Sequence, residues 1–369
     1  MTELDRSSRV WLERYRSRVR GCLLGGAVGD ALGAPVEFLS LQQIWEKYGA
    51  DGVTDMLVSE GGRAAVTDDT QMTLFTTEGL IRASVRWDRG VCHPPSVVHR
   101  AYLRWLDTQQ RPAPPERPDG WLAAQRWLYA RRAPGNACLS GLRAGQMGTP
   151  EQPQNPDSKG CGAVMRSAPF GLHPDASPDN VFDLAVECAT QTHGHPSGYL
   201  AAGAFAAIIR GQLDERCLRD AVDVALDLLA SRPGHEEVSA ALREAVAPRG
   251  REPSPPDVQR LGGGWVAEEA LGIGVYCALS YPDPTDVRRA LLLAINHSGD
   301  SDSTGSICGN LLGAWHGETA LPPDWVADLE GRSTIVELAD DLAAEYTQGN
   351  QLHGDYRPDT RWTTRYPGS

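Results

Sequence analysis

Apolar residues recur along this chain mainly at spacings of three and four, which is the period of an amphipathic helix. In the segment 213–231 they stand between acids and arginines at Leu218, Val222, Ala225 and Leu229. The same pattern predicts further helices at 11–32, 70–85, 95–109, 121–131, 178–191, 196–210, 235–246, 265–280, 284–296, 304–316 and 334–347. Alternating strand patterns are nearly absent, so the sequence predicts an all-α protein.

Stretches rich in proline and glycine separate the predicted helices at 111–120, 148–160 and 247–264. We interpret these stretches as loops within one domain, because they do not resemble domain linkers and the sequence contains no repeat at a solenoid period. The predicted organisation is an N-terminal extension over 1–19, an all-α domain over 20–348 and a C-terminal tail over 349–369. Aromatic and arginine side chains in the extension could contact a partner.

Composition and charge narrow the class of protein. Hydrophobic residues make up 41% and charged residues 22% of the chain, which is ordinary for a globular protein and excludes wholesale disorder. Lys and Arg number 35 against 48 Asp and Glu, a formal net charge of −13. Such an acidic protein repels phosphate backbones, so a sequence-independent nucleic-acid binder is not expected, although a local phosphate site is compatible with the charge.

Several features of the sequence point to the cytoplasm. The N-terminal segment has no apolar core of a signal peptide, and the apolar run at 199–209 is too short to cross a bilayer. None of the eight cysteines forms a C-x-x-C pair, and most lie in apolar stretches. We therefore expect free thiols in a reducing compartment, with neither a structural zinc site nor a disulfide framework.

Three segments rich in glycine or acids depart from the helical pattern. The first, 20–38, carries glycines at four-residue spacing, at Gly21, Gly25, Gly29 and Gly33. Each glycine inside a helix costs about 1 kcal/mol relative to alanine, so this many indicate a close helix contact or a site. The pattern alone does not decide between a packed core helix and a site helix.

The second segment, 66–80, places two adjacent acids at the start of an apolar helical run. Asp68 and Asp69 stand between Thr67 and Thr70, whose hydroxyl oxygens could add to the carboxylates. Acids at a helix start also stabilise the helix dipole, so helix capping would explain one of them when the segment is taken alone.

The third segment, 296–317, places Asp300 and Asp302 before a glycine-rich apolar helix, with hydroxyls beside them at Ser301, Ser303 and Thr304. It lacks the length and the terminal glutamate of an EF-hand loop. Four facing carboxylates would repel strongly without a cation, and oxygen ligands without Cys or His favour Mg²⁺, Mn²⁺ or Ca²⁺ over zinc. If the fold brings the two acid pairs together, a binuclear site for hard cations is the simplest explanation.

Five motifs, in this order, resemble those of the ADP-ribosylglycohydrolase family, which includes the dinitrogenase reductase-activating glycohydrolases and the ADP-ribosyl-acceptor hydrolases. They are GDALGAPVE at 29–37, TDDTQM at 67–72, GCGAVMR at 160–166, THGHP at 192–196 and GDSDSTG at 299–305. The resemblance extends from residue 19 to residue 317. It implies a compact orthogonal bundle of helices with two Mg²⁺ ions, for which Mn²⁺ could substitute, in a central cleft.

The resemblance assigns a role to each matching acid and hydroxyl. Metal ligands would be Thr67, Asp68 and Asp69 from one side and Asp300, Asp302 and Ser303 from the other, with Asp302 as the bridge. Ser303 stands where the family often has Thr, and Thr304 follows it, so either hydroxyl could be the ligand. The catalytic carboxylates would be Glu37, Asp68, Asp69 and Asp302, with Glu37 contacting a metal or gating the site.

The same resemblance predicts a substrate-binding set that consists of Gly160, Cys161, Gly162, Ala163, Met165, Arg166, His193 and Ser301. Backbone N–H groups of the 158–171 loop would hold the ribose and pyrophosphate. Cys161 replaces the Asn that family members often have between the two glycines. Arg166 would contact a phosphate or pair with a site carboxylate, and His193 would bond the ligand or position a metal ligand.

The implied activity is metal-assisted hydrolysis of the glycosidic bond between ADP-ribose and an acceptor, with a mono-ADP-ribosylated protein as substrate and free ADP-ribose as product. The motif form favours an arginine linkage. Serine-, nucleic-acid- and small-molecule-linked ADP-ribose stay open as substrates. So does a binding or immunity protein that recognises ADP-ribose or a toxin without turnover. No membrane partner is expected.

Overall fold

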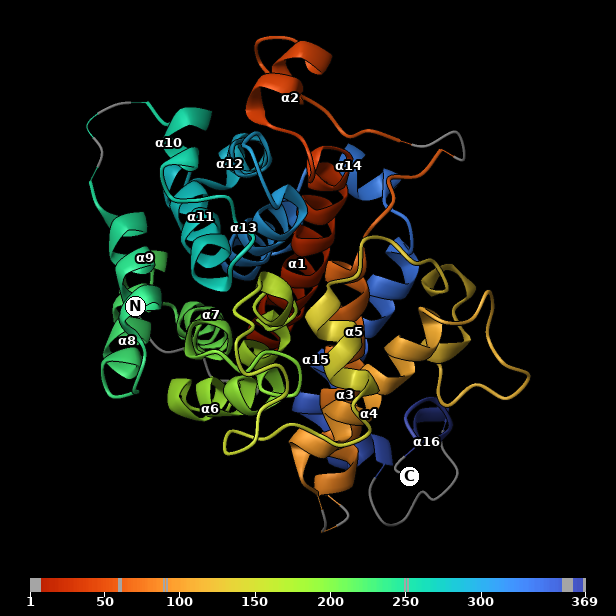
Figure 1. The fold of residues 1–369 in the computed structure, drawn as a ribbon. Coiled ribbons are helices and arrows are strands. Elements are labelled where there is room, and N and C mark those ends of the chain that lie inside the picture. Colours follow the sequence, from red (N-terminus) through yellow and green to blue (C-terminus); the bar gives the residue numbers. More distant parts are fainter. Residues whose placement is uncertain are drawn as a thin grey trace.

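A computed structural model describes residues 8–58, 62–88, 90, 92–248, 250, 252–353 and 361–367. The regular elements in these residues are helices, and strand-like pairing there is limited to two isolated bridges, Ala64–Leu329 and Gly160–Val266. The helices cross at varied angles around a large shared core (Figure 1). The predicted all-α fold is therefore confirmed.

Within the described residues the α-helices are α1 (Arg9–Gly33), α2 (Leu41–Tyr48), α3 (Asp68–Trp87), α4 (Pro94–Thr108), α5 (Asn136–Arg143), α6 (Pro178–Ala189), α7 (Pro196–Leu213), α8 (Leu218–Ala230), α9 (Glu236–Val246), α10 (Pro255–Gln259), α11 (Ala267–Ser280), α12 (Val287–Ile295), α13 (Ser301–His316), α14 (Pro323–Asp328), α15 (Arg332–His353) and α16 (Arg361–Arg365). Short 3₁₀ turns lie between them, at η1 (Ala34–Val36), η2 (Leu122–Ala124), η3 (Arg126–Leu128), η4 (Cys161–Ala163), η5 (Ala168–Leu172), η6 (Pro284–Asp286) and η7 (Glu318–Ala320). Serine side chains cap several helix starts; Ser177, for example, accepts from the Asn180 N–H.

The helix predicted at 121–131 is wrong, because that segment contains only the turns η2 and η3. Gln125 has an extended backbone (φ −78°, ψ 107°) that ends the first turn before a helix can propagate. Conversely, the sequence pattern does not predict α2 and α5. Each has only eight residues, which give too few turns for a three-to-four periodicity to stand out.

The glycine-rich helix α1 runs through the middle of the molecule with α13 beside it (Figure 1). A Cβ on Gly25 would lie 2.2 Å from the Gly309 carbonyl oxygen, and one on Gly29 would lie 1.9 Å from that of Gly305. Glycine is therefore required on both helices, because their backbones touch. This close contact carries the end of α1 to the start of α13, where the predicted acids lie.

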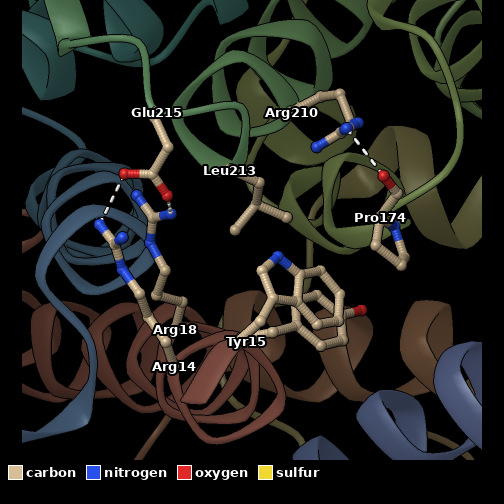
Figure 2. Close-up of a pocket in the computed structure, with 8 residues that line it drawn as sticks. Arg14, Tyr15, Arg18, Pro174, Arg210, Leu213 and Glu215 are labelled. Atoms are coloured by element: carbon tan, nitrogen blue, oxygen red, sulfur yellow. Dashed lines mark hydrogen bonds and ion pairs between the residues drawn. The ribbon is translucent and has the colours of Figure 1, made fainter. Parts of the chain in front are cut away.

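The N-terminal part of α1 is packed into the domain. The helix passes residue 20, the predicted domain boundary, without a break. Tyr15 is buried and donates to the Leu172 carbonyl oxygen at 2.7 Å, and it lies in a pocket where Arg14 and Arg18 both reach Glu215 (Figure 2). Its ring is thus not available as an exposed surface for a partner.

Among the described residues, no single helix combines the length and the apolar composition that a membrane span needs. One pair, Arg9–Val36 with Leu41–Tyr48, meets that test only when the two are taken together, and the pair is bent by 87°.

At the other end of the chain, α15 passes residue 349 without a break, and the Arg365 guanidinium of α16 lies 3.4 Å from the Trp121 ring centroid. The described part of the predicted tail therefore contacts the domain.

Candidate metal and substrate site

The two acid pairs of the sequence meet at the N-terminal ends of α3 and α13. Carboxylate oxygens of Glu37, Asp300 and Asp302 lie within 4.8 Å of one another, and all three residues are buried. The Ser303 hydroxyl donates to a carboxylate oxygen of Asp69 at 2.9 Å, although the two residues are 234 positions apart in the sequence. The structure therefore brings together the groups that the sequence places in separate segments.

Asp30, on α1, fixes the start of α3. Its carboxylate accepts hydrogen bonds from the backbone N–H groups of Thr67 at 3.0 Å and Thr70 at 3.1 Å, and from the Thr70 hydroxyl at 2.5 Å. Thr67 is the N-cap of α3, and its hydroxyl accepts from the Asp69 N–H at 3.3 Å. The sequence pattern does not identify Asp30 as a site residue. The available signal was a lone acid within a glycine-rich, otherwise apolar helix.

The hydroxyls of Ser303 and Thr304 point in different directions. Thr304 Oγ1 lies 2.8 Å from Nε2 of His297 and also donates to the Ala294 carbonyl oxygen at 2.8 Å. It is therefore occupied inside the helix packing, while the Ser303 hydroxyl meets the carboxylate of Asp69. This geometry favours Ser303 over Thr304 as the hydroxyl beside the acids.

Burial raises the pKa of Asp68, Asp69 and Asp302 well above the usual range of a carboxyl, and neighbouring acids raise it further. Burial, followed by the charge of Asp300, raises the pKa of Glu37 to about 8. Buried carboxylates that repel one another, with hydroxyl oxygens beside them, form a donor set that suits hard divalent cations. The residues present therefore fit the metal that the motifs imply.

The glycine loop predicted to bind substrate lies against these acids. Its turn η4 (Cys161–Ala163) places the Cys161 thiol 2.7 Å from a carboxylate oxygen of Asp300, to which it donates. A Cβ on Gly162 would lie 2.8 Å from the Cys138 sulfur, so this position requires glycine. The side chain that stands in place of the family's Asn thus contacts a predicted metal ligand.

The other predicted substrate residues of this loop and of α13 differ in what they face. The Met165 sulfur lies 3.8 Å from the Ser303 hydroxyl, so Met165 borders the acids. Ala163 is fully buried within a cluster of alanines, and Ser301 is fully buried with its hydroxyl directed at backbone carbonyl oxygens. Neither of these last two residues is accessible to a ligand in this structure.

Arg166 is buried and forms no ion pair with a described site carboxylate, contrary to one of its two predicted roles. Its guanidinium lies 4.3 Å from the Tyr102 ring centroid and donates to the Thr192 hydroxyl at 2.7 Å. The same hydroxyl lies 2.8 Å from Nδ1 of His193, so Arg166 orients His193 through Thr192. Burial lowers the pKa of His193 to about 3, which keeps the ring neutral at physiological pH.

The segment 263–266 joins the two site loops, a role that the sequence pattern does not indicate. The Gly263 carbonyl accepts from the Asp300 N–H at 2.8 Å, and the Trp265 carbonyl accepts from the Cys161 N–H at 3.2 Å. The sequence signal for this role is the run of glycines at 262–264, since glycines permit a close approach of backbones. Both site loops are thereby held in register by one strand-like piece of chain.

Together, the fold and the site define an all-helical protein with a buried acidic cluster suited to divalent cations, placed beside a glycine loop. A family model described as ADP-ribosylglycohydrolase matches residues 12–351. The chain therefore belongs to the ADP-ribosylglycohydrolase family. It is a hydrolase that acts on glycosyl bonds of ADP-ribose.

Individual relatives agree with this membership. The chain is 26% identical over 321 residues to the ADP-ribosyl-[dinitrogen reductase] glycohydrolase of Rhodospirillum rubrum, with 85% of this chain and 90% of that protein covered. It is 25% identical over 345 residues to the ADP-ribosylarginine hydrolase Tri1 of Pseudomonas putida (strain GB-1), with 92% and 81% covered. A solved structure titled "ADP-ribosylglycohydrolase-related protein complex" matches with a TM-score of 0.63 and 25% identity, over 90% of this chain and 99% of that one.

Proposed function

We propose that this protein releases ADP-ribose from an arginine side chain of a modified protein, in a reaction that depends on two Mg²⁺ ions. The observation that carries the proposal is the buried group of Glu37, Asp300 and Asp302, whose carboxylate oxygens lie within 4.8 Å of one another. Acids this close are unfavourable unless a cation or protons offset their charge. Family membership supports ADP-ribose as the group that is released, and the buried acids support a cation site.

The residues that would hold the cations lie at the starts of α3 and α13, at Thr67, Asp68, Asp69, Asp300, Asp302 and Ser303. Mn²⁺ could replace Mg²⁺, because both prefer oxygen ligands. Divalent cations bound there would make a coordinated water more acidic and would offset the repulsion among the carboxylates.

The acids of the chain would also handle the proton and the charge of the reaction. A carboxylate of Asp68 or Asp69, or that of Glu37, accepts a proton from the attacking water. The bond between the anomeric carbon and the acceptor nitrogen breaks, a bond from that carbon to the water oxygen forms, and the nitrogen takes the bonding electron pair and a proton. The positive charge that develops on the ribose is stabilised by the surrounding carboxylates, Asp302 among them.

The ADP-ribose half of the substrate would lie along the glycine loop. Backbone N–H groups around Gly160 and Gly162 would hold the pyrophosphate, which reconciles phosphate binding with an acidic protein. His193 would meet a ligand oxygen as a neutral ring, oriented by Thr192 and Arg166. Cys161 and Met165 would border the ribose, since both lie beside the acids.

The arginine linkage rests on the names of two relatives. One is an ADP-ribosylarginine hydrolase, and the other is a glycohydrolase whose named substrate is an ADP-ribosylated protein, dinitrogen reductase.

We place the reaction in the cytoplasm, because all eight cysteines are free, as a reducing compartment would leave them.

Release of ADP-ribose from arginine-, serine- and nucleic-acid-linked substrates, measured with Mg²⁺ and with a chelator, tests the proposal. We expect release from the arginine-linked protein that stops when the chelator is added and that is lost in Asp302→Ala. An absence of release from all three substrates would refute the hydrolase assignment, while release from serine alone would refute the arginine linkage. Protection against a modifying toxin that persists in Asp302→Ala would indicate a binding protein instead.

A further inference from the structure

Two large aromatic side chains are exposed at the edge of the acidic cluster. Phe38 is 69% and Trp265 is 44% exposed, yet they stack on each other with ring centroids 5.5 Å apart and planes inclined by 26°. Single exposed aromatics are common on protein surfaces, but a stacked pair beside a buried site is a larger apolar surface that a ligand can cover. The pair is therefore a candidate for ligand contact.

The two rings belong to different segments, each of which contacts the site. Phe38 directly follows Glu37, whose carboxylate lies with those of Asp300 and Asp302. Trp265 belongs to the segment whose backbone joins the two site loops, and its own carbonyl accepts from the Cys161 N–H. The stacked pair thus connects the α1 side of the site to its loop side.

The position of Trp265 is fixed by the backbone around it. Glu269 accepts hydrogen bonds from the N–H groups of Gly263 at 2.9 Å and Gly264 at 3.2 Å, just before the tryptophan. Immediately after it, Val266 forms an antiparallel bridge with Gly160. The exposure of the indole therefore does not result from a loose loop, because its main chain is held on both sides.

We propose that Phe38 and Trp265 form the acceptor subsite and bind the arginine side chain that carries ADP-ribose. This inference rests on the proposed function and names the part of the substrate that the glycine loop leaves unrecognised. A guanidinium is planar, cationic and weakly hydrated, so it stacks well on aromatic faces, and the methylenes of arginine cover apolar surface. A serine acceptor would offer neither the charge nor the plane.

Kinetics of Phe38→Leu and Trp265→Leu on an arginine-linked protein test the subsite. Leucine keeps an apolar side chain and removes the aromatic face. We expect KM to rise about tenfold in each variant, in keeping with a cation–π contact of a partly desolvated cation, with kcat changed less. Affinity for free ADP-ribose in the presence of Mg²⁺, measured by calorimetry, should stay at the wild-type value.

Trp87→Leu is the matched control. Trp87 is 67% exposed at the far end of α3, about 29 Å along the helix from Asp68 at a rise of 1.5 Å per residue, so its loss should leave KM unchanged. If Phe38→Leu and Trp265→Leu behave like this control, the subsite is refuted. A weakened affinity for free ADP-ribose in these variants would also refute it, because the pair would then serve the nucleotide half.

Binding of agmatine, a guanidinium compound, to protein loaded with Mg²⁺ and ADP-ribose separates the subsite from the proposed function. Agmatine should bind the wild type and bind Trp265→Leu about tenfold more weakly. A wild-type protein that binds agmatine in this way but releases nothing from arginine-linked protein would refute the proposed function alone. A wild type that releases ADP-ribose from arginine but binds agmatine no better than Trp265→Leu would refute the subsite alone.

Discussion

Asp30 is buried in α1 and holds the first turn of α3 through three hydrogen-bond donors. Asp30→Asn keeps the size of the side chain but turns an NH₂ group towards some of these donors. We expect a loss of about 1–3 kcal/mol in the free energy of unfolding, because a buried donor is left unpaired. We also expect ADP-ribose release to fall about tenfold or more, because Thr67 and Asp69 lose their fixed position.

Thermal unfolding and initial rates at saturating Mg²⁺ measure the two effects of Asp30→Asn separately. A lowered Tm combined with a wild-type rate, at a temperature where the variant is folded, would show that Asp30 only stabilises the helix start. Burial is the main reason why the pKa of Asp30 rises to about 6, and its hydrogen bonds act in the opposite direction.

Ser303 and Thr304 provide a second contrast between neighbouring residues. Ser303→Ala removes the hydroxyl beside Asp69, so we expect a higher Mg²⁺ concentration at half-maximal activity with little change in Tm. Thr304→Val removes the contacts to His297 and to the Ala294 carbonyl, so we expect a destabilisation of about 1–3 kcal/mol and an unchanged Mg²⁺ requirement. Mg²⁺ titrations of the rate and thermal unfolding of both variants distinguish them, and an exchange of the two phenotypes would assign the ligand to Thr304.

The chemical type of a residue predicts its role only where its partners are implied by the motif. Asp68, Asp69, Asp300 and Asp302 could be recognised from sequence as two pairs of acids at the start of apolar helices, and the motif resemblance implied that the pairs share one site. Asp30 could not, because its partners are backbone N–H groups of another helix. A guanidinium can bind a phosphate or stack on an aromatic ring, so only the structure shows that Arg166 lies over Tyr102.

At the scale of elements, the contact between α1 and α13 leaves no space for side chains. Gly25→Ala places a methyl group 2.2 Å from the Gly309 carbonyl oxygen, so the helices must separate. We expect a destabilisation of at least about 1–3 kcal/mol, which outweighs the gain of about 1 kcal/mol from replacing a helical glycine. Gly272→Ala on α11 is the control, because its new Cβ would be 3.4 Å from the Ala241 carbonyl oxygen, an ordinary contact.

Chemical denaturation of both glycine variants measures these effects. Gly272→Ala should equal or exceed the wild type in stability, and equal stability of Gly25→Ala would contradict the backbone contact. The four-residue spacing of the glycines predicts such a contact, yet it does not identify the partner helix. That information lies in Gly305, Gly309 and Gly313, which repeat the spacing on α13 and become meaningful only when the two helices are paired.

Helices with several buried turns could be predicted well, and short segments could not. α8 shows the apolar period over its whole length, whereas the aromatic and alanine residues of 121–131 imitate that period without forming an α-helix. Each 3₁₀ turn there satisfies only local hydrogen bonds, and tertiary packing of Leu122 and Leu128 holds the segment. Periodicity reports which side chains are buried, and it does not report how the backbone between them is hydrogen-bonded.

At the scale of the whole molecule, the site exists only because distant parts of the chain meet. Asp69 and Ser303 are 234 positions apart, and no spacing rule in the sequence predicts their contact. The contact follows from two packing relations, α1 against α13 and the first turn of α3 against Asp30. The same helix contacts thus form both the core and the site, so the binding of a cation in the site should affect the stability of the whole fold.

Mg²⁺ should therefore stabilise the entire protein, by about 2.7 kcal/mol at a hundredfold excess over its Kd. Burial and the charges of Asp69 and Asp300 raise the pKa of the Asp302 carboxyl, so its ionisation opposes folding when no metal is bound. Asp302→Asn removes this ionisable group and should therefore raise the Tm of the metal-free protein. The same substitution should abolish most of the Mg²⁺-dependent shift in Tm. Asp257→Asn, at a buried acid that caps α10, should lower the Tm and keep the shift intact. Thermal unfolding with Mg²⁺ and with a chelator measures all three proteins. An equal Mg²⁺-dependent shift in Asp302→Asn and in the wild type would mean that the cation binds elsewhere, because only a ligand of the site can couple its charge to both stability and metal.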